Sequence, residues 1–220
     1  ESSKITKAAK LIKNSYLDGG QLYVFGTGHS HMMAEESFHR AGGFAGACPI
    51  LDPNTDFSKG AEKATKLERT PGLATKVLNK YKLRTKDILI IYSNSGVNHV
   101  PVEAALYAKK RKMKSISVLS YDYSKKAPLS KLNKRLFEIT DLFIDNKIPR
   151  GDSIIKINDI TVGPASTIAG SFILNSILVE LAGSLKNRKP FPFYISSNMP
   201  NADVNNNILI KKYKKLNKHL

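Results

Sequence analysis

The chain has 220 residues, of which 41% are hydrophobic and 24% are charged. This ordinary globular balance excludes an intrinsically disordered chain, and the length suits a single α/β domain over residues 1–220. The one cysteine, Cys48, excludes a disulfide framework and favours a reducing, cytoplasmic location.

The formal net charge of +17 raises the question of nucleic-acid binding. However, the lysines are spread along the chain, and aromatic residues do not interleave with them. The densest runs, Lys109–Lys112 and Lys211–Lys215, fit the solvated end or face of a helix. We therefore expect no nucleic-acid partner and keep a basic nucleic-acid-binding protein only as an alternative.

Helical and strand patterns alternate along the chain. A helix over Ser3–Leu17 ends at Asp18-Gly19-Gly20, since glycine favours helix ends. The first half then predicts a strand at Gln21–Phe25, a helix from Ser30 to just before Gly42, a short strand at Ala47–Leu51, a loop up to Arg69, and a helix at Gly72–Lys80. The second half predicts strands at Asp87–Tyr92, Ser115–Ser120 and Asp141–Asp145, helices at Pro101–Lys112, Pro164–Leu185 and Asn206–Leu216, and an extended segment at Phe193–Ser197. Short apolar strands separated by helices favour a parallel sheet covered on both faces.

The uncharged stretch Ile160–Val179 is long enough to span a bilayer. It contains, among others, Pro164, Ser166, Thr167, Ser171, Asn175 and Ser176. This polarity argues against a membrane span, so we expect a buried helix and no membrane partner.

Two short loops rich in glycine and hydroxyl residues each follow a predicted strand. They are Gly26-Thr27-Gly28-His29-Ser30 and Ser93-Asn94-Ser95-Gly96-Val97-Asn98. In a parallel sheet, both lie at the carboxyl ends of strands, where open α/β sheets bind ligands. The helix N-termini that follow such loops favour anions. The pattern therefore predicts a phosphorylated small molecule as ligand, with ordinary turn and capping chemistry as the alternative.

The paired loops resemble the phosphosugar-binding signature of the SIS (sugar isomerase) domain, in which Ser-x-Ser-Gly-x-Thr follows a later strand. Asn98 stands where threonine is usual, and an amide also donates to phosphate. Together with Ala34-Glu35-Glu36 and Arg40–Gly43, the first loop resembles a single-domain group related to phosphoheptose isomerases. Asn205 departs from that group, because histidine is common at this position.

This resemblance implies a three-layer α/β/α sandwich around a five-stranded parallel sheet, of the flavodoxin-like SIS type. It also implies a homodimer or homotetramer, because sites in this family borrow groups from a neighbouring subunit. A sugar phosphate is the implied ligand. The residues expected to bind it are Gly28, His29, Ser30, Ser93, Asn94, Ser95, Gly96, Asn98 and Asp152.

Aldose–ketose isomerisation through a cis-enediol needs a base to move a proton between adjacent carbons. Glu35 and Glu36 follow the first loop on a predicted helix, and neighbouring helical residues point about 100° apart, so only one of them faces the site. Glu68 is the competing base. The alternative role for each of these carboxylates is a charge at a helix N-terminus.

Histidines 29, 31 and 39 cluster after the first loop, and His31 and Glu35 have the i, i+4 spacing of metal ligands. No third ligand is evident, so we expect no cofactor, although a divalent metal is left open. A role for His29 or His31 in sugar binding or ring opening is favoured, and His31 is a candidate catalytic residue. The sequence thus supports a phosphosugar isomerase or, alternatively, a non-catalytic phosphosugar sensor.

Overall fold

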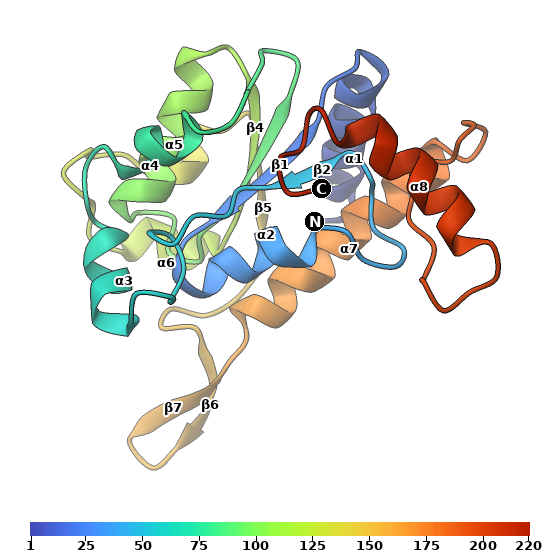
Figure 1. Ribbon diagram of the computed structural model, residues 1–220. Helices are drawn as coiled ribbons and strands as arrows, with labels where there is room; N and C mark the ends of the chain where they lie inside the picture. Colours follow the sequence, from blue (N-terminus) through green and yellow to red (C-terminus); the bar gives the residue numbers. More distant parts are fainter.

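A five-stranded parallel sheet lies at the centre of the computed structural model, which describes all 220 residues (Figure 1). The strand order is β2-β1-β3-β4-β5. The strands are β1 (Leu22–Gly26), β2 (Ala47–Pro49), β3 (Ile88–Tyr92), β4 (Lys114–Leu119) and β5 (Leu142–Asp145). Helices cover both faces, so the predicted α/β fold with a five-stranded parallel sheet is confirmed.

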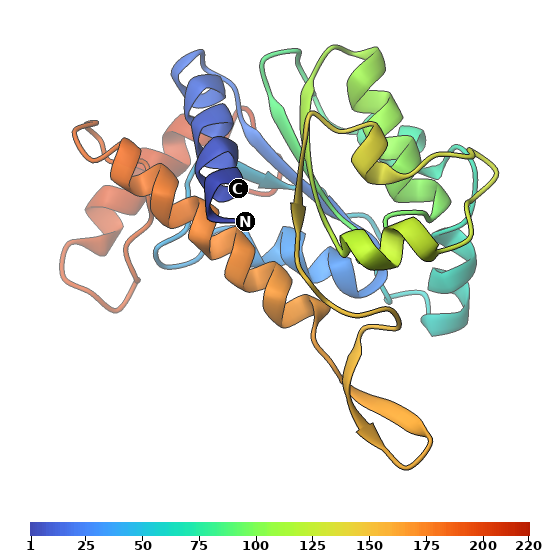
Figure 2. The same cartoon turned by 180° about the vertical axis from the view of Figure 1, so that it is seen from behind.

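Eight α-helices and two short 3-10 helices connect the strands. The α-helices are α1 (Ser2–Leu17), α2 (Met32–Glu36), α3 (Ala61–Leu67), α4 (Leu73–Leu78), α5 (His99–Lys110), α6 (Tyr121–Lys126), α7 (Ser166–Ser184) and α8 (Ala202–Tyr213). The 3-10 helices are η1 (Gly28–His31) and η2 (Leu136–Glu138). The helices α1 and α7 lie on one face of the sheet, and α4 and α5 lie on the other (Figures 1 and 2).

The alternation of side chains along β1 divides the core in two. Leu22 and Val24 pack in the cluster that includes α1 and α7, whereas Tyr23 and Phe25 pack with α4 and α5. Every residue of β1 and β3 is buried, which explains why these strands are continuously apolar instead of alternating.

The helix predicted from Ser30 to Gly42 is much shorter, and that prediction is wrong in extent. Only η1 and α2 form, and α2 ends at Glu36. The chain beyond it pairs with a distant segment: the N–H of Gly42 donates to Tyr194 O at 2.9 Å, and Phe44 bridges Phe193. These tertiary hydrogen bonds compete with continuation of the helix.

Two further elements were not expected. The supposed loop before Arg69 contains α3, and α6 follows β4 directly. The helix α6 begins at a capping serine, because Ser120 Oγ accepts a hydrogen bond from the N–H of Tyr123 at 3.2 Å.

An antiparallel hairpin of β6 (Ser153–Ile157) and β7 (Ile160–Pro164) projects from the body and was also missed (Figure 2). Its turn contains Asn158, which takes a positive φ of 53° that asparagine tolerates. The uncharged run from Ile160 is therefore a strand followed by a helix. The hairpin exposes four isoleucines by more than half, namely Ile154, Ile155, Ile157 and Ile160.

Helix α7 is buried on one face only, so the expectation of a buried helix holds for that face and is wrong for the other. Ile168, Phe172 and Val179 are 73%, 71% and 71% exposed. Of all the helices, only α7 is long and apolar enough to cross a membrane. The core helices of soluble proteins meet the same criterion of length and composition. Residues four and seven apart share a helix face, so these three side chains form an apolar stripe.

Candidate functional site

The two hydroxyl-rich loops lie side by side where the strand order reverses direction. β1 and β3 are neighbours in the sheet although β2 separates them in sequence. This is the switch point of a 2-1-3-4-5 sheet, and ligands of open α/β folds bind there, beyond the carboxyl ends of the strands.

A cavity of about 380 Å³ opens at this switch point. It brings together eight of the nine predicted binding residues and one predicted base. They are Gly28, His29, Ser30, Ser93, Asn94, Ser95, Asn98, Asp152 and Glu68. Gly96 supports the second loop without lining the cavity, and His31, Glu35 and Glu36 lie elsewhere.

Close backbone packing shapes the first loop. A Cβ at Gly26 would lie 2.2 Å from Ser30 O, so only glycine fits there. The N–H of Gly28 donates to Thr55 O at 2.9 Å, and Gly28 has a φ of +56°. The loop therefore turns sharply from β1 into η1 and presents Ser30 to the cavity.

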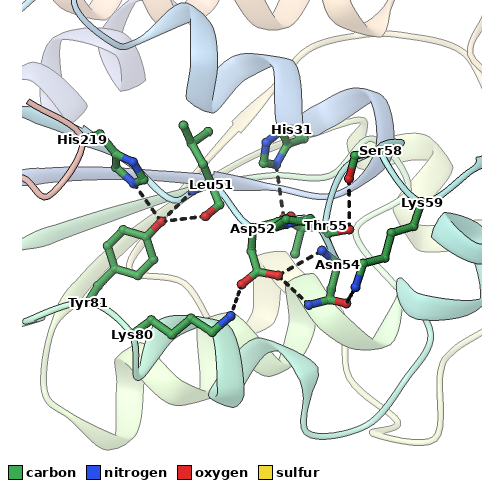
Figure 3. A network of polar contacts seen from close by, with 11 residues as sticks. His31, Leu51, Asp52, Asn54, Thr55, Ser58, Lys59, Lys80, Tyr81 and His219 are labelled. Atoms are coloured by element: carbon green, nitrogen blue, oxygen red, sulfur yellow. Dashed lines mark hydrogen bonds and ion pairs between the residues drawn. The ribbon is translucent and has the colours of Figure 1, made fainter.

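A polar network beneath the first loop holds this turn in place (Figure 3). Asp52 forms an ion pair with Lys80 and accepts hydrogen bonds from the N–H and Nδ2 of Asn54 at 2.9 and 2.7 Å. Burial alone would raise the pKa of Asp52, but these hydrogen bonds outweigh it and hold that pKa below its usual value. The carboxylate thus stays charged and fixes the turn that carries Thr55.

His219, near the end of the sequence, contacts the same network. Tyr81 Oη accepts a hydrogen bond from the N–H of Leu51 at 2.7 Å and lies 3.0 Å from His219 Nε2 (Figure 3). Through Tyr81, His219 thus helps to position the segment after β2. That segment carries Thr55, whose carbonyl oxygen accepts the hydrogen bond from Gly28 of the first loop.

The second loop makes a turn over Ser95–Asn98, called the nest below, directly in front of α5. Ser93 Oγ accepts a hydrogen bond from the N–H of Gly96 at 3.3 Å, and Gly96 has a φ of +62°. The backbone N–H groups of Ser95, Val97 and Asn98 form no hydrogen bond within the protein. Unpaired N–H groups at the N-terminus of a twelve-residue helix are suited to an oxyanion.

Asn98 precedes α5 without capping it. It occupies the N-cap position, yet its side chain makes no capping hydrogen bond. The amide is half-buried and lines the cavity, so it is free to donate to a ligand as the usual threonine would.

Glu68 is the carboxylate that the structure places in the cavity without an ion-pair partner. It follows α3, is half-buried, and its Oε1 accepts a hydrogen bond from Thr27 Oγ1 at 2.7 Å. Thr27 belongs to the first loop, so this bond sets the carboxylate beside the ligand-binding residues. One carboxylate oxygen is thereby oriented, and the other remains available for proton transfer.

Asp152 also lines the cavity, but Ser166 engages both of its oxygens. Oδ1 accepts a hydrogen bond from the N–H of Ser166, and Oδ2 accepts one from Ser166 Oγ, each at 2.8 Å. Asp152 therefore fastens the base of the β6–β7 hairpin to the start of α7, at the edge of the cavity.

The other two candidate bases lie on α2, outside the cavity. Glu36 forms an ion pair with Arg40, and its Oε1 accepts a hydrogen bond from Asn175 Nδ2 of α7 at 3.3 Å. The side chain of Glu35 is 60% exposed and lies 3.7 Å from His31 Nε2. Both glutamates line a separate depression of about 470 Å³.

The histidines divide in the same way. His29 is exposed, lines the cavity and lies against the ring of Phe57 at 4.7 Å between ring centroids. His31 is buried beneath the loop, with its Nδ1 3.3 Å from Thr55 Oγ1. No group of three or more His, Cys, Asp or Glu side chains in the chain is arranged to hold a metal ion, and no third such residue joins the His31–Glu35 pair.

The only cysteine lies in the core and not at the site. Cys48 is fully buried in β2, and burial raises the pKa of its thiol to about 12. The thiol therefore stays protonated, which excludes a nucleophilic role at neutral pH.

Several lining residues were missed from the sequence. Phe57, Thr65, Tyr123, Gly151 and Ser166 all face the cavity. Tyr123 lies on α6, for which the signal was Ser120, a capping residue directly after a strand. Phe57 and Thr65 come from segments without a local pattern, and tertiary folding alone brings them here.

Comparison with known proteins identifies related sequences and folds. A model of the SIS domain matches residues 1–120. A UPF0309 protein of Brucella anthropi is 40% identical over 218 residues, which cover 98% of this chain and 89% of the relative. The corresponding protein of Brucella canis is 38% identical over 221 residues, covering 100% and 90% of the two chains.

Two solved structures share the fold. The phosphoheptose isomerase of Neisseria gonorrhoeae has a TM-score of 0.50 and 17% identity, covering 82% of this chain and 86% of its own. A Listeria monocytogenes protein classed provisionally as a sugar-phosphate isomerase has a TM-score of 0.52 and 18% identity, covering 86% and 81%. At these identities the similarity shows the SIS-like fold alone.

Proposed function

This chain belongs to the SIS domain family, as a UPF0309 protein, and we propose that it is a sugar-phosphate isomerase. The observation that carries the proposal is the cavity at the switch point, where Ser95 and Asn98, whose backbone N–H groups have no partner in the protein, line the same space as the Glu68 carboxylate. The first feature suits a phosphate, and the second suits a base.

In the proposed reaction the nest of Ser95, Val97 and Asn98 holds the phosphate, and hydroxyl and imidazole groups of the first loop bind the sugar. Glu68 accepts the proton from C2 of the open-chain aldose, which leaves a cis-enediolate with its negative charge on O1. A proton then moves from the C2 hydroxyl to O1, and Glu68 returns its proton to C1, which yields the ketose. His29 is placed to assist ring opening.

Thermal unfolding in the presence of ligands tests the binding step. At about one hundred times its dissociation constant, a specific sugar phosphate should stabilise the fold by roughly 2.7 kcal/mol. For a domain of this size, that is a rise in Tm of several degrees, at about 2–4 °C per kcal/mol. The panel should contain hexose, N-acetylhexosamine, pentose and heptulose phosphates.

Inorganic phosphate and the matching unphosphorylated sugars are the controls, and neither should reproduce the shift. If no phosphosugar raises Tm, the hydroxyl loops are structural turns and the proposal is wrong.

A phosphosugar sensor is the second candidate, favoured by the side chain at position 205. Asn205 Nδ2 donates to Phe193 O at 3.4 Å, so this amide serves the local fold. An amide cannot exchange protons as the histidine common in relatives can. A sensor would bind the sugar phosphate without exchanging its C2 proton.

We also propose that two copies of the chain associate through α7. The stripe of Ile168, Phe172 and Val179 is exposed by more than two thirds, and single apolar side chains rather than continuous stripes are usual on monomers. The β6–β7 hairpin, whose second strand leads directly into the start of α7, adds four exposed isoleucines (Figure 2). A two-stranded hairpin is marginally stable alone, so contact with a second copy would also stabilise it.

The variant Phe172→Asp tests this assembly by light scattering after size exclusion. Each protomer loses a buried phenylalanine, worth roughly 1.5–3 kcal/mol, and gains a charge that must be desolvated. We expect the assembly to dissociate to monomers under conditions where the wild-type chain is a dimer or tetramer.

Leu17→Asp is the matched control, because Leu17 is 47% exposed but is the last residue of α1 and does not belong to the stripe. Its assembly should be unchanged. A wild-type monomer at all concentrations, or a Phe172→Asp variant of unchanged mass, contradicts the α7 interface.

A further inference from the structure

A second, larger cavity lies on the other side of the phosphate-binding loop. Its volume is about 620 Å³, against about 380 Å³ for the site cavity. Ser95, Asn98 and Tyr123 line both cavities, so the second loop forms a shared wall. A ligand that reaches past this wall would occupy both spaces at once.

The charge of the second cavity is positive. Arg69 and Lys131 line it, and no aspartate or glutamate does. Neither cation forms an ion pair in the protein. Both side chains are exposed at the rim of this open cavity, so their positive charges meet at one place that a ligand can reach.

The glutamate of α5, the helix that follows the second loop, is already engaged. Glu103 lies 4.0 Å from His99, which lines the cavity, but its carboxylate accepts hydrogen bonds from the N–H of Thr75 at 3.2 Å and from Thr75 Oγ1 at 2.6 Å. Glu103 therefore caps α4 and is not free to neutralise Arg69 and Lys131.

The backbone couples the two cavities. Glu68 and Arg69 are consecutive residues after α3, and they line the site cavity and the second cavity respectively. The N–H of Val100 donates to Glu68 O at 3.1 Å, which fixes this segment against the start of α5. A ligand bound by Arg69 would therefore have a fixed position relative to Glu68, the proposed base.

We propose that the ligand of this protein carries a second anionic group, bound by Arg69 and Lys131, in addition to the phosphate bound by the second loop. This inference rests on the proposed function and narrows its substrate class to sugar phosphates with a further phosphate or carboxylate. Ligand pockets of several hundred cubic ångströms take groups larger than a single anion, so the second cavity also has room for the atoms that join the two groups.

Two matched pairs of compounds test the inference by titration calorimetry. Fructose 6-phosphate is compared with fructose 1,6-bisphosphate, and glucose 6-phosphate is compared with 6-phosphogluconate. The first pair adds a phosphate and the second a carboxylate, so the pairs distinguish the two sources of negative charge. We expect at least one doubly anionic compound to bind at least about tenfold more tightly than its singly phosphorylated partner. This is the gain in affinity that a hydrogen bond to a charged group typically gives.

The double variant Arg69→Ala/Lys131→Ala should lose this preference, while its affinity for the singly phosphorylated compounds should change by less than about threefold, since the nest is intact. Lys109→Ala/Lys110→Ala removes the same charge from the far end of α5 and should retain the preference. Equal affinity within both pairs, or an equal loss for all four compounds in the double variant, overturns the inference. Binding of none of the four compounds also overturns the inference, whereas the proposed function fails only if no sugar phosphate of the wider thermal-unfolding panel binds either.

Discussion

The variant Ser95→Asp should bind sugar phosphates roughly 1,000-fold more weakly than the wild-type chain. Ser95 lies in the nest of unpaired N–H groups, where an aspartate would place a negative charge against the phosphate. Two unit charges about 4 Å apart repel by about 4 kcal/mol near a protein surface, which corresponds to that change in Kd. Titration calorimetry with the sugar phosphate selected by thermal unfolding measures the effect.

Asn207→Asp is the control for charge, because it adds the same carboxylate at an exposed position of α8. Its affinity should match that of the wild-type chain. Ser95 is half-buried in a loop, so the melting curve of Ser95→Asp without ligand shows whether the fold persists. A folded Ser95→Asp variant with wild-type affinity would show that the phosphate lies elsewhere.

The second large effect is expected for Glu68→Gln. An amide keeps the size of the side chain and can still accept the hydrogen bond from Thr27 Oγ1, but it cannot accept the C2 proton. We expect exchange of the C2 hydrogen with solvent deuterium to fall by about 10²–10⁴-fold, the usual contribution of a general base. The affinity for the sugar phosphate should stay within a few-fold, because the nest is unchanged.

Glu62→Gln on α3 is the matched control, since Glu62 is exposed and does not line the cavity. Glu36→Gln tests the competing carboxylate on α2. If Glu36→Gln and not Glu68→Gln loses exchange, the base comes from the α2 side of the molecule. Binding by the wild-type chain without any exchange would favour the sensor.

Much of the sheet follows from local patterns. Continuous runs such as Ile88–Tyr92 can be stable only where both faces are covered, which is why they indicated a parallel sheet. Elements stabilised by distant partners were not predictable in this way. The helix after Ser30 stops early because residues 42–45 pair with the segment 192–194, about 150 positions later in the chain.

The site shows the same division. Glycine and serine at the ends of β1 and β3 mark two loops, and the parallel pairing of these strands places them together. The choice among three candidate bases could not be made locally, since Glu35, Glu36 and Glu68 all follow plausible helix or loop patterns. Glu68 enters the cavity because Thr27 Oγ1 bonds to it across 41 positions of sequence, whereas Arg40 and α7 engage Glu36.

The sequence by itself determined that the sheet is parallel and that a glycine- and serine-rich loop follows each of two strands. Both features depend on the spacing of apolar residues and on turn-forming residues, which act over a few neighbouring positions. The tertiary structure alone decided which side chains share a cavity, that Arg69 and Lys131 face a second one, and that one face of α7 is left uncovered. These features depend on contacts between residues far apart in the sequence, and those contacts are set by how distant helices and loops pack on the sheet.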